Sequence, residues 1–201
     1  DSIITNDVGM VAWGEGKIDA DPMFVDTANG NYHLLASSQC INAGHPDSTD
    51  SDGTIADIGA YPHLNSYSGP PWYITDEGND TAGTGDSDNP FSSIPAGINF
   101  SSSGDSVTVA AGTYVENIHF PGKNIDVIGV DRETTIIDGD NSGSVVTFSS
   151  WPSSTTVFSG FTIQNGNNND GGGILVDGTS PTLSNLIIKN NAAVSNGGGI
   201  Y

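Results

Sequence analysis

The residues best suited to chemistry in this sequence are carboxylates, which gather in two clusters. The first cluster consists of Asp47, Asp50, Asp52 and Asp57, and the second of Asp76, Glu77, Asp80, Asp86 and Asp88. No lysine or arginine lies between Lys17 and Lys123, although that span is rich in acidic residues. Carboxylates packed this densely repel one another unless water or a cation screens their charge.

Calcium is the cation that these clusters suit, because it takes Asp, Asn and backbone carbonyl oxygens in flexible geometry. The stretch "DSTDSDG", residues 47–53, places several Asp residues before a glycine, as calcium loops do, but it lacks the downstream bidentate Glu of an EF-hand. Both clusters therefore predict weak calcium sites, with dissociation constants of about 10⁻⁴–10⁻³ M as in extracellular modules. A solvated acidic turn that binds no ion is the alternative.

The whole chain is acidic and polar. Its 201 residues include 24 acids, 4 bases and 27 glycines, and the net charge is −20. Hydrophobic residues still make up 35% and recur periodically, so the sequence predicts an ordered, turn-rich β fold rather than a disordered chain. Such a charge disfavours nucleic acid and anionic membranes as partners and suits cations or neutral sugars. No segment approaches the roughly 20 apolar residues of a membrane span.

Two stretches near the C-terminus repeat each other, "GFTIQNGNNNDGGGI" at 160–174 and "NLIIKNNAAVSNGGGIY" at 185–201. The equivalent positions, separated by one constant interval, are Phe161 and Leu186, Ile163 and Ile188, and Asn165 and Asn190. A β-sandwich does not require such likeness, whereas a parallel solenoid does, because each side chain stacks on its equivalent in the next turn. The repeats therefore predict a solenoid, in which Asn165 and Asn190 form a hydrogen-bonded ladder.

The apolar clusters from residue 106 onward fall into two phased sets. One set comprises 107–109, 125–128, 145–148, 173–176 and 199–201, and the other comprises 118–120, 136–137, 161–163 and 186–188. Short strands at this spacing, separated by Gly, Asn, Asp and Ser, are typical of stacked coils. Ile200 and Tyr201 then lie on the last turn, whose unpaired backbone groups could bind another β-edge.

A short helix is predicted within "DNPFSSIPAGI", residues 88–98. Asn89 could cap it, or the helix could begin near Ile94, because Pro95 is awkward inside a helix. Its apolar residues would share one face and cover the hydrophobic end of the first coil.

Four segments are predicted along the chain. They are a β-rich closing segment at 1–65, a linker with the first strand at 66–75, an acidic loop with the capping helix at 76–105, and parallel coils at 106–201 that are open at the C-terminal end. The linker assignment depends on the Gly-Pro-Pro at 69–71.

With these motifs the chain resembles bacterial secreted right-handed parallel β-helix repeat proteins, the pectate-lyase-like proteins of choice-of-anchor and adhesin type. "DADPMFVD" at 19–26 and "DGTIADIGAY" at 52–61 are similar to their C-terminal closing segment, and "WYITDEGND" at 72–80 and "GTYVENI" at 112–118 to their N-terminal cap and first coil. The resemblance implies an all-β fold, a right-handed parallel β-helix with a short N-terminal capping helix, preceded by the closing segment. It also implies an extracellular or cell-surface location.

The order of these parts, with a closing segment before an opening one, allows two interpretations. The chain could span the end of one β-helix and the start of the next in a tandem protein. Alternatively, the N-terminal piece of one molecule could complete the open end of another, and such head-to-tail contacts build filaments.

The favoured function is therefore structural or adhesive, stabilised by calcium, with partners that are further copies or a neighbouring β-helix domain. The alternative is a polysaccharide lyase or a glycoside hydrolase, because the superfold hosts those activities as well. No catalytic residue is assigned.

A lyase needs a Lys or Arg base, and Lys123, Arg132 and Lys189 are available besides Lys17. Arg132 is expected to pair with a neighbouring acid at the surface, and Lys189 to face solvent. A hydrolase needs two carboxylates about 5–10 Å apart, for which Asp126, Asp138 and Asp140 could line one face. Aromatic residues that could stack on sugar rings are Trp13, Trp72, Trp151 and Tyr201, although Trp72 is expected to pack at the cap.

Overall fold

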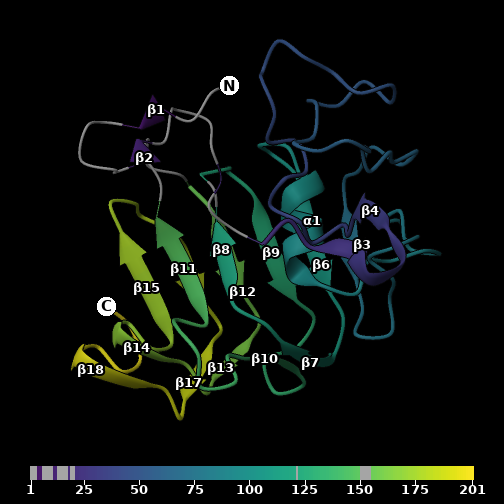
Figure 1. The fold of residues 1–201 in the computed structure, drawn as a ribbon. Helices are drawn as coiled ribbons and strands as arrows, with labels where there is room; N and C mark the ends of the chain where they lie inside the picture. Colours follow the sequence, from purple (N-terminus) through teal and green to yellow (C-terminus); the bar gives the residue numbers. More distant parts are fainter. Residues whose placement is uncertain (1–3, 6–10, 13–17, 19–20, 121, 150–154) are drawn as a thin grey trace.

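The computed structural model describes residues 4–5, 11–12, 18, 21–120, 122–149 and 155–201. The described part of the chain is mostly β-strand and turn, with one α-helix (Figure 1). Most of its strands belong to three parallel sheets of five, four and three strands, so the fold class is all-β with several parallel sheets.

The strands of the three sheets are short. The five-stranded sheet contains, in spatial order, β16 (Thr182–Ser184), β12 (Val157–Ser159), β9 (Asp126–Gly129), β6 (Ser106–Val109) and β5 (Trp72–Ile74). The four-stranded sheet contains β17 (Ile187–Lys189), β13 (Thr162–Gln164), β10 (Thr135–Asp138) and β7 (Gly112–Val115). The three-stranded sheet contains β15 (Ile174–Asp177), β11 (Val146–Ser149) and β8 (Ile118–Phe120).

From β6 onward the chain visits these sheets in rotation, and each return places the new strand parallel to the previous one. We call each passage a coil and define the coils by their residues: the first is 106–120, the second 126–149, the third 157–177 and the last 182–201. In the five-stranded sheet Ser106 pairs with Asp126, Asp126 with Val157, and Val157 with Thr182. Two further strands, β14 (Asn167–Asp170) and β18 (Ala192–Asn196), pair with each other in parallel at one corner of the stack.

The two phased sets of apolar clusters are correct only in part. Ile137, Ile163 and Ile188 do pair from coil to coil, as the second set predicts. Ile118 does not belong with them, because it pairs with Val146 in another sheet. All three sheets share the same alternation of inward and outward residues, so a short apolar run does not show to which sheet it belongs. The constant interval between the two C-terminal repeats does hold, because Ile163 pairs with Ile188 across the third and last coils.

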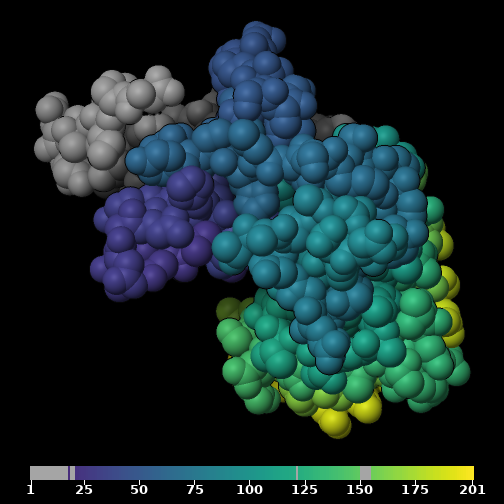
Figure 2. Space-filling model, turned by 90° about the vertical axis from the view of Figure 1, so that its right-hand side faces the viewer, coloured from purple at the N-terminus to yellow at the C-terminus, as the bar shows by residue number. Residues whose placement is uncertain are grey.

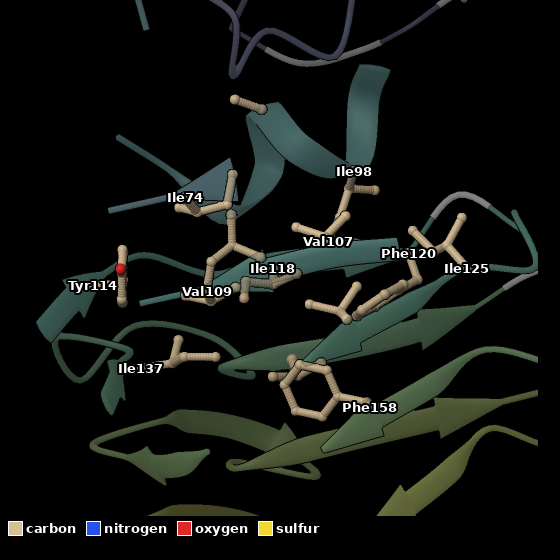
Figure 3. Close-up of a cluster of buried hydrophobic side chains, with 14 of the residues drawn as sticks. Ile74, Ile98, Val107, Val109, Tyr114, Ile118, Phe120, Ile125, Ile137 and Phe158 are labelled. Atoms are coloured by element: carbon tan, nitrogen blue, oxygen red, sulfur yellow. The ribbon is translucent and has the colours of Figure 1, made fainter. Parts of the chain in front are cut away.

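The core between the sheets is filled by inward side chains that alternate along each strand, as Figure 3 shows for the first coils. Four phenylalanines, each at most 1% exposed, occupy its centre: Phe120, Phe148, Phe158 and Phe161. Phe120 stacks on Phe148 at 4.4 Å between ring centroids, and Phe158 stacks on Phe161 at 4.6 Å. Edge-to-face contacts join the two stacks, so the rings interlock along the axis.

The predicted capping helix begins at the later of the two positions considered. Helix α1 spans Ile94–Phe100, Ser93 is its N-cap, and the Ser93 hydroxyl accepts a hydrogen bond from the Ala96 amide. Asn89 is therefore not the cap. A Cβ at Gly97 would lie 2.8 Å from side-chain atoms of Ile74 and Val107, which places the helix directly on β5 and β6.

The N-terminal segment, which we define as residues 21–65, consists mainly of turns around one antiparallel hairpin of β3 (Phe24–Asp26) and β4 (Asn31–Leu34). A one-turn 3₁₀ helix η1 (Thr27–Asn29) lies within this hairpin, so the segment contains less β structure than predicted. The preceding strands β1 (Ile4–Thr5) and β2 (Val11–Ala12) pair antiparallel.

The N-terminal segment packs over the capping helix of its own chain. Leu34 and Ala36 are at most 2% exposed. The Asn99 amide, on α1, donates to the carbonyls of Ala36 and Ser38 at 3.1 and 2.8 Å. One end of the stack is thus covered twice, first by α1 and then by this segment.

Candidate functional site

The first acidic cluster binds backbone amides. Asp50, Asp52 and Asp57 accept hydrogen bonds of 2.7–3.1 Å from the backbone N–H groups of Asn42, Thr54, Asp57, His63 and Asn65. Burial raises the pKa of Asp57 despite two of these bonds. Asp47, in contrast, has a side chain that is 92% exposed and lies 3.9 Å from His45. Three of the four carboxylates therefore shape the turns at 42–65.

The second acidic cluster is used in the same way. Asp80 accepts bonds from the Ser92 and Ser93 amides and, at 2.6 Å, from the Ser93 hydroxyl, which orients the N-cap of α1. Asp86 accepts from the Thr84 hydroxyl at 2.6 Å, and this bond lowers the pKa of Asp86.

Asp76, Glu77 and Asp88 complete the second cluster. The Asp76 carboxylate lies against Gly112, where a Cβ would come within 2.5 Å of it, and both Glu77 and Asp88 are exposed. Across both clusters, and among the described residues generally, no three His, Cys, Asp or Glu side chains form a group that could hold a metal ion. Calcium at these residues stays a prediction.

The predicted asparagine pair occupies equivalent positions in adjacent coils. Asn165 and Asn190 each follow a paired strand end, and both have a φ of 57°, in the left-handed region that Asn tolerates. The Asn165 amide donates to Asp138 in the coil before it, at 2.8 Å. Asn191 also bridges coils, because its side chain accepts from the Gly166 amide and donates to the Ile163 carbonyl. Polar bridges between coils are therefore present, while a direct Asn165–Asn190 ladder stays a prediction.

The described residues considered for catalysis do not converge, and Lys17 lies outside the described residues. Arg132 pairs with Glu133 at 3.5 Å with both side chains largely exposed, and Lys189 is exposed, as expected. Asp126 and Asp138 belong to different sheets, so the expectation that they line one face is wrong.

Of the aromatic residues considered for sugar stacking, the structure describes Trp72 and Tyr201. Trp72 is 2% exposed, and its indole N–H donates to Asp105 at 3.0 Å, so it packs at the cap as predicted. Tyr201 is 55% exposed on the last coil. Trp13 and Trp151 lie outside the described residues.

A cleft of about 880 Å³ separates the N-terminal segment from the first coil. It is visible in Figure 2 as the hollow between the purple N-terminal residues and the coils below them. Met23 and Ile41 line one wall, and Glu116, His119 and Lys123 line the other. These three titratable side chains lie within β8 or just beyond its two ends.

Glu116 is the most perturbed acid of the cleft. Its Oε1 accepts a hydrogen bond from the Ile94 amide at 3.1 Å, at the first turn of α1. Burial, reinforced by the negative charge of Asp80 and opposed by the Ile94 bond, raises the pKa of Glu116 to about 8. The carboxyl group is therefore mostly protonated at neutral pH.

Lys123 holds the opposite end of the same helix. Its ammonium donates to the carbonyls of Ile98 and Asn99 at 2.9 and 2.7 Å. These carbonyls belong to the last turn of α1, where a cation is favoured. Burial lowers the pKa of Lys123 to about 8, against the opposing charge of Asp105. Burial also lowers the pKa of His119.

The cleft thus combines a protonated acid with a second carboxylate, Asp80, at its margin. That pairing is what glycoside hydrolysis uses for general acid and base. Both Asp80 oxygens already accept bonds from Ser92 and Ser93, and Glu116 and Lys123 clamp α1. The arrangement is foremost a clamp on the capping helix.

The sequence did not single out Glu116, although a signal was present. In "GTYVENIHF" the buried residues Tyr114, Ile118 and Phe120 alternate, and Glu116 falls on the same alternation. An acid in phase with core residues indicates a buried carboxyl.

Comparison with known proteins does not identify a family for this chain. No protein-family model and no curated protein sequence matches this chain. Within the described residues, no helix is long and apolar enough to traverse a lipid bilayer.

Replacing Glu116 with Gln is expected to change how stability depends on pH. A carboxyl whose pKa is raised by folding binds its proton more tightly in the folded state, so wild-type stability falls as pH rises from about 4.5 to about 8. Gln stays neutral and can still accept from Ile94. Urea unfolding at a series of pH values measures the effect. Between pH 5 and pH 8, the free energy of unfolding of the variant should rise by at least about 1 kcal/mol relative to that of the wild type.

Glu133→Gln is the matched control, because the Glu133 side chain is 65% exposed. Its pH profile should parallel that of the wild type. A Glu116→Gln profile parallel to the wild type as well would show that Glu116 titrates normally.

Proposed function

We propose that this chain is part of a right-handed parallel β-helix protein of the bacterial secreted kind, and that its role is structural or adhesive, outside the cell. The observation that carries the proposal is the rotation of the chain through three parallel sheets, with each strand paired in register to its equivalent in the next coil. Rods of this construction present long, regular lateral surfaces, which suit adhesion and assembly better than they suit a single pocket.

The distribution of titratable groups supports a non-enzymatic role. Carboxylates from both acidic clusters, such as Asp50, Asp52 and Asp80, accept backbone bonds in turns. The exposed Arg132 and Lys189 do not contact them. The proposed partners are further copies of the chain or a neighbouring β-helix domain of the same protein. A polysaccharide is the proposed adhesive ligand, given that an acidic surface suits neutral sugars.

A second function, glycoside hydrolysis in the cleft, is favoured by one observation. Glu116 is protonated at neutral pH in a cleft large enough for a sugar residue, and the negative charge of Asp80 acts on it. Under this alternative Glu116 would act as the general acid.

A polysaccharide-cleavage screen separates the two functions. The chain is incubated with neutral and acidic polysaccharides in the presence of calcium, and reducing ends and unsaturated products are measured. The structural proposal expects no turnover with the wild type or with Glu116→Gln. Turnover that Glu116→Gln abolishes and Glu133→Gln leaves intact would contradict it and assign the hydrolase.

Calcium is proposed to stabilise the protein through the first acidic cluster, at the exposed Asp47. Thermal unfolding in millimolar calcium should then have a higher midpoint than in EDTA, because a ligand that binds the folded state stabilises it. Asp47→Asn should reduce that difference, while Asp126→Asn, at an exposed position on β9, should leave it unchanged. An identical midpoint of thermal unfolding with and without calcium would contradict the proposed calcium site.

A further inference from the structure

We propose that the side chains of Lys123 and Asn42 condense into an intramolecular isopeptide bond, which joins the N-terminal segment covalently to the stack of coils. Lys123 lies between the first and second coils, and Asn42 lies in the N-terminal segment. The inference rests on the contacts, burial and chemistry of these two side chains. It is independent of the extracellular role proposed above.

The two side chains meet at one backbone oxygen. The Lys123 ammonium donates to the Asn99 carbonyl at 2.7 Å, and the Asn42 side-chain amide donates to the same carbonyl at 3.5 Å. Asn42 and Lys123 are distant in sequence, and helix α1, which carries Asn99, brings them together. The amide carbon of Asn42 is therefore within reach of the lysine, whose four-carbon stem is flexible.

The contact lies between two cavities. Asn42, Asn99 and Lys123 line the cleft of about 880 Å³ described above, and the same three residues line a second cavity of about 560 Å³. No other residue lines both cavities, so these three form the partition between them. The two reacting side chains thus bridge the gap between the N-terminal segment and the coils, with room to move and a path by which a small molecule can leave.

Lys123 has the properties of a lysine nucleophile. Among the described residues, no carboxylate lies within ion-pair distance of its ammonium. Burial lowers the pKa of Lys123 to about 8, against the opposing charge of Asp105. A fraction of the amine is therefore uncharged at neutral pH, and the uncharged amine is the form that attacks a carbonyl group. Condensation also removes a buried positive charge, which is costly to keep.

Asn42 provides an amide that hydrogen bonds do not hold in place. Within the described part of the chain, its Oδ1 is the one buried side-chain nitrogen or oxygen without a hydrogen-bond partner. The Nδ2 contact, at 3.5 Å, is at the outer limit of a hydrogen bond. The backbone of Asn42 is fixed, in contrast, because its N–H donates to Asp57 at 2.8 Å. The amide group can therefore turn toward Lys123 while the residue stays in position.

The reaction exchanges one nitrogen for another. The uncharged Nζ of Lys123 attacks Cγ of Asn42, the bond from Nζ to Cγ forms, and the bond from Cγ to Nδ2 breaks. One proton moves from Nζ to Nδ2, which leaves as ammonia, and the Asp57 carboxylate beside the Asn42 backbone can carry that proton. No oxidant or further reactant is needed. The N–H of the product keeps the bond to the Asn99 carbonyl that Nζ makes before the reaction.

Intact-mass spectrometry of the denatured wild-type chain tests the proposal directly. The mass should be lower than that of the sequence by one ammonia molecule. Trypsin should not cleave after Lys123, because its side chain is no longer a cation, and fragmentation of the digest should show position 42 joined to position 123. A wild-type mass equal to that of the sequence, with cleavage after Lys123, would overturn the proposal.

Variants separate this bond from other losses of ammonia. Lys123→Arg keeps a cation at the end of α1 but cannot form the bond, and Asn42→Ala removes the amide, so both should have the full mass of their sequences. Lys189→Arg is the matched control, because Lys189 is exposed, and it should retain the loss of ammonia. A loss that persists in Lys123→Arg would indicate a cyclic imide at an Asn-Gly sequence, such as that at 165–166, and would overturn the proposal.

Discussion

Parallel, in-register pairing between strands of successive coils is the constraint on which the rest of this structure depends. Because each strand lies directly on its equivalent, the alternation of inward and outward residues is preserved from coil to coil, and inward side chains must stack. The interlocked phenylalanines of the core follow from that geometry. Coil lengths differ, and the chain from Asp126 to Val157 is longer than that from Ser106 to Asp126. The extra residues lie in the corners between strands, so the register of the paired strands is kept.

The start of the stack is covered by a helix that buried side chains hold in place. At the first coil, α1 covers the exposed core and is clamped by Glu116 at its N-terminal turn and Lys123 at its C-terminal turn. The clamp requires a carboxyl and an ammonium group to be buried, and this burial shifts both pKa values toward about 8. The coil at 182–201 contains no acidic residue, in contrast to the three coils before it.

The features that could be predicted from the sequence are the local and the repeated ones. The likeness between Phe161 and Leu186 predicted the pairing of the third and last coils. The proline at 95 made a start near Ile94 one of the two positions considered for α1, and the helix begins there. Sequence reasoning could not assign strands to sheets, because all three sheets have the same two-residue alternation. Nor could it foresee that the N-terminal segment packs on α1, since that contact joins Ala36 and Ser38 to the distant Asn99 with no local signal.

The acids illustrate the same limit. From sequence alone a dense group of Asp residues indicates a cation, because the backbone amides that satisfy Asp50, Asp52 and Asp57 cannot be read from residue types. Glu116 shows the reverse case, an acid whose residue type gave no sign of a special role. Its neighbours in "YVENI" resemble an ordinary strand and turn, and only its alternation with the buried Tyr114 and Ile118 indicates that it points inward.

The central claim, that coils stack in parallel register, is tested most directly by joining two of them. Ser159 and Ser184 pair across the third and last coils with their hydroxyl oxygens 3.0 Å apart. Residues paired in neighbouring strands are within the reach of a disulfide, so Ser159→Cys/Ser184→Cys should form one on mild oxidation. Ser149→Cys/Ser184→Cys, whose positions belong to different sheets, should not. A disulfide in the control pair and none in the paired positions would contradict the stacked arrangement.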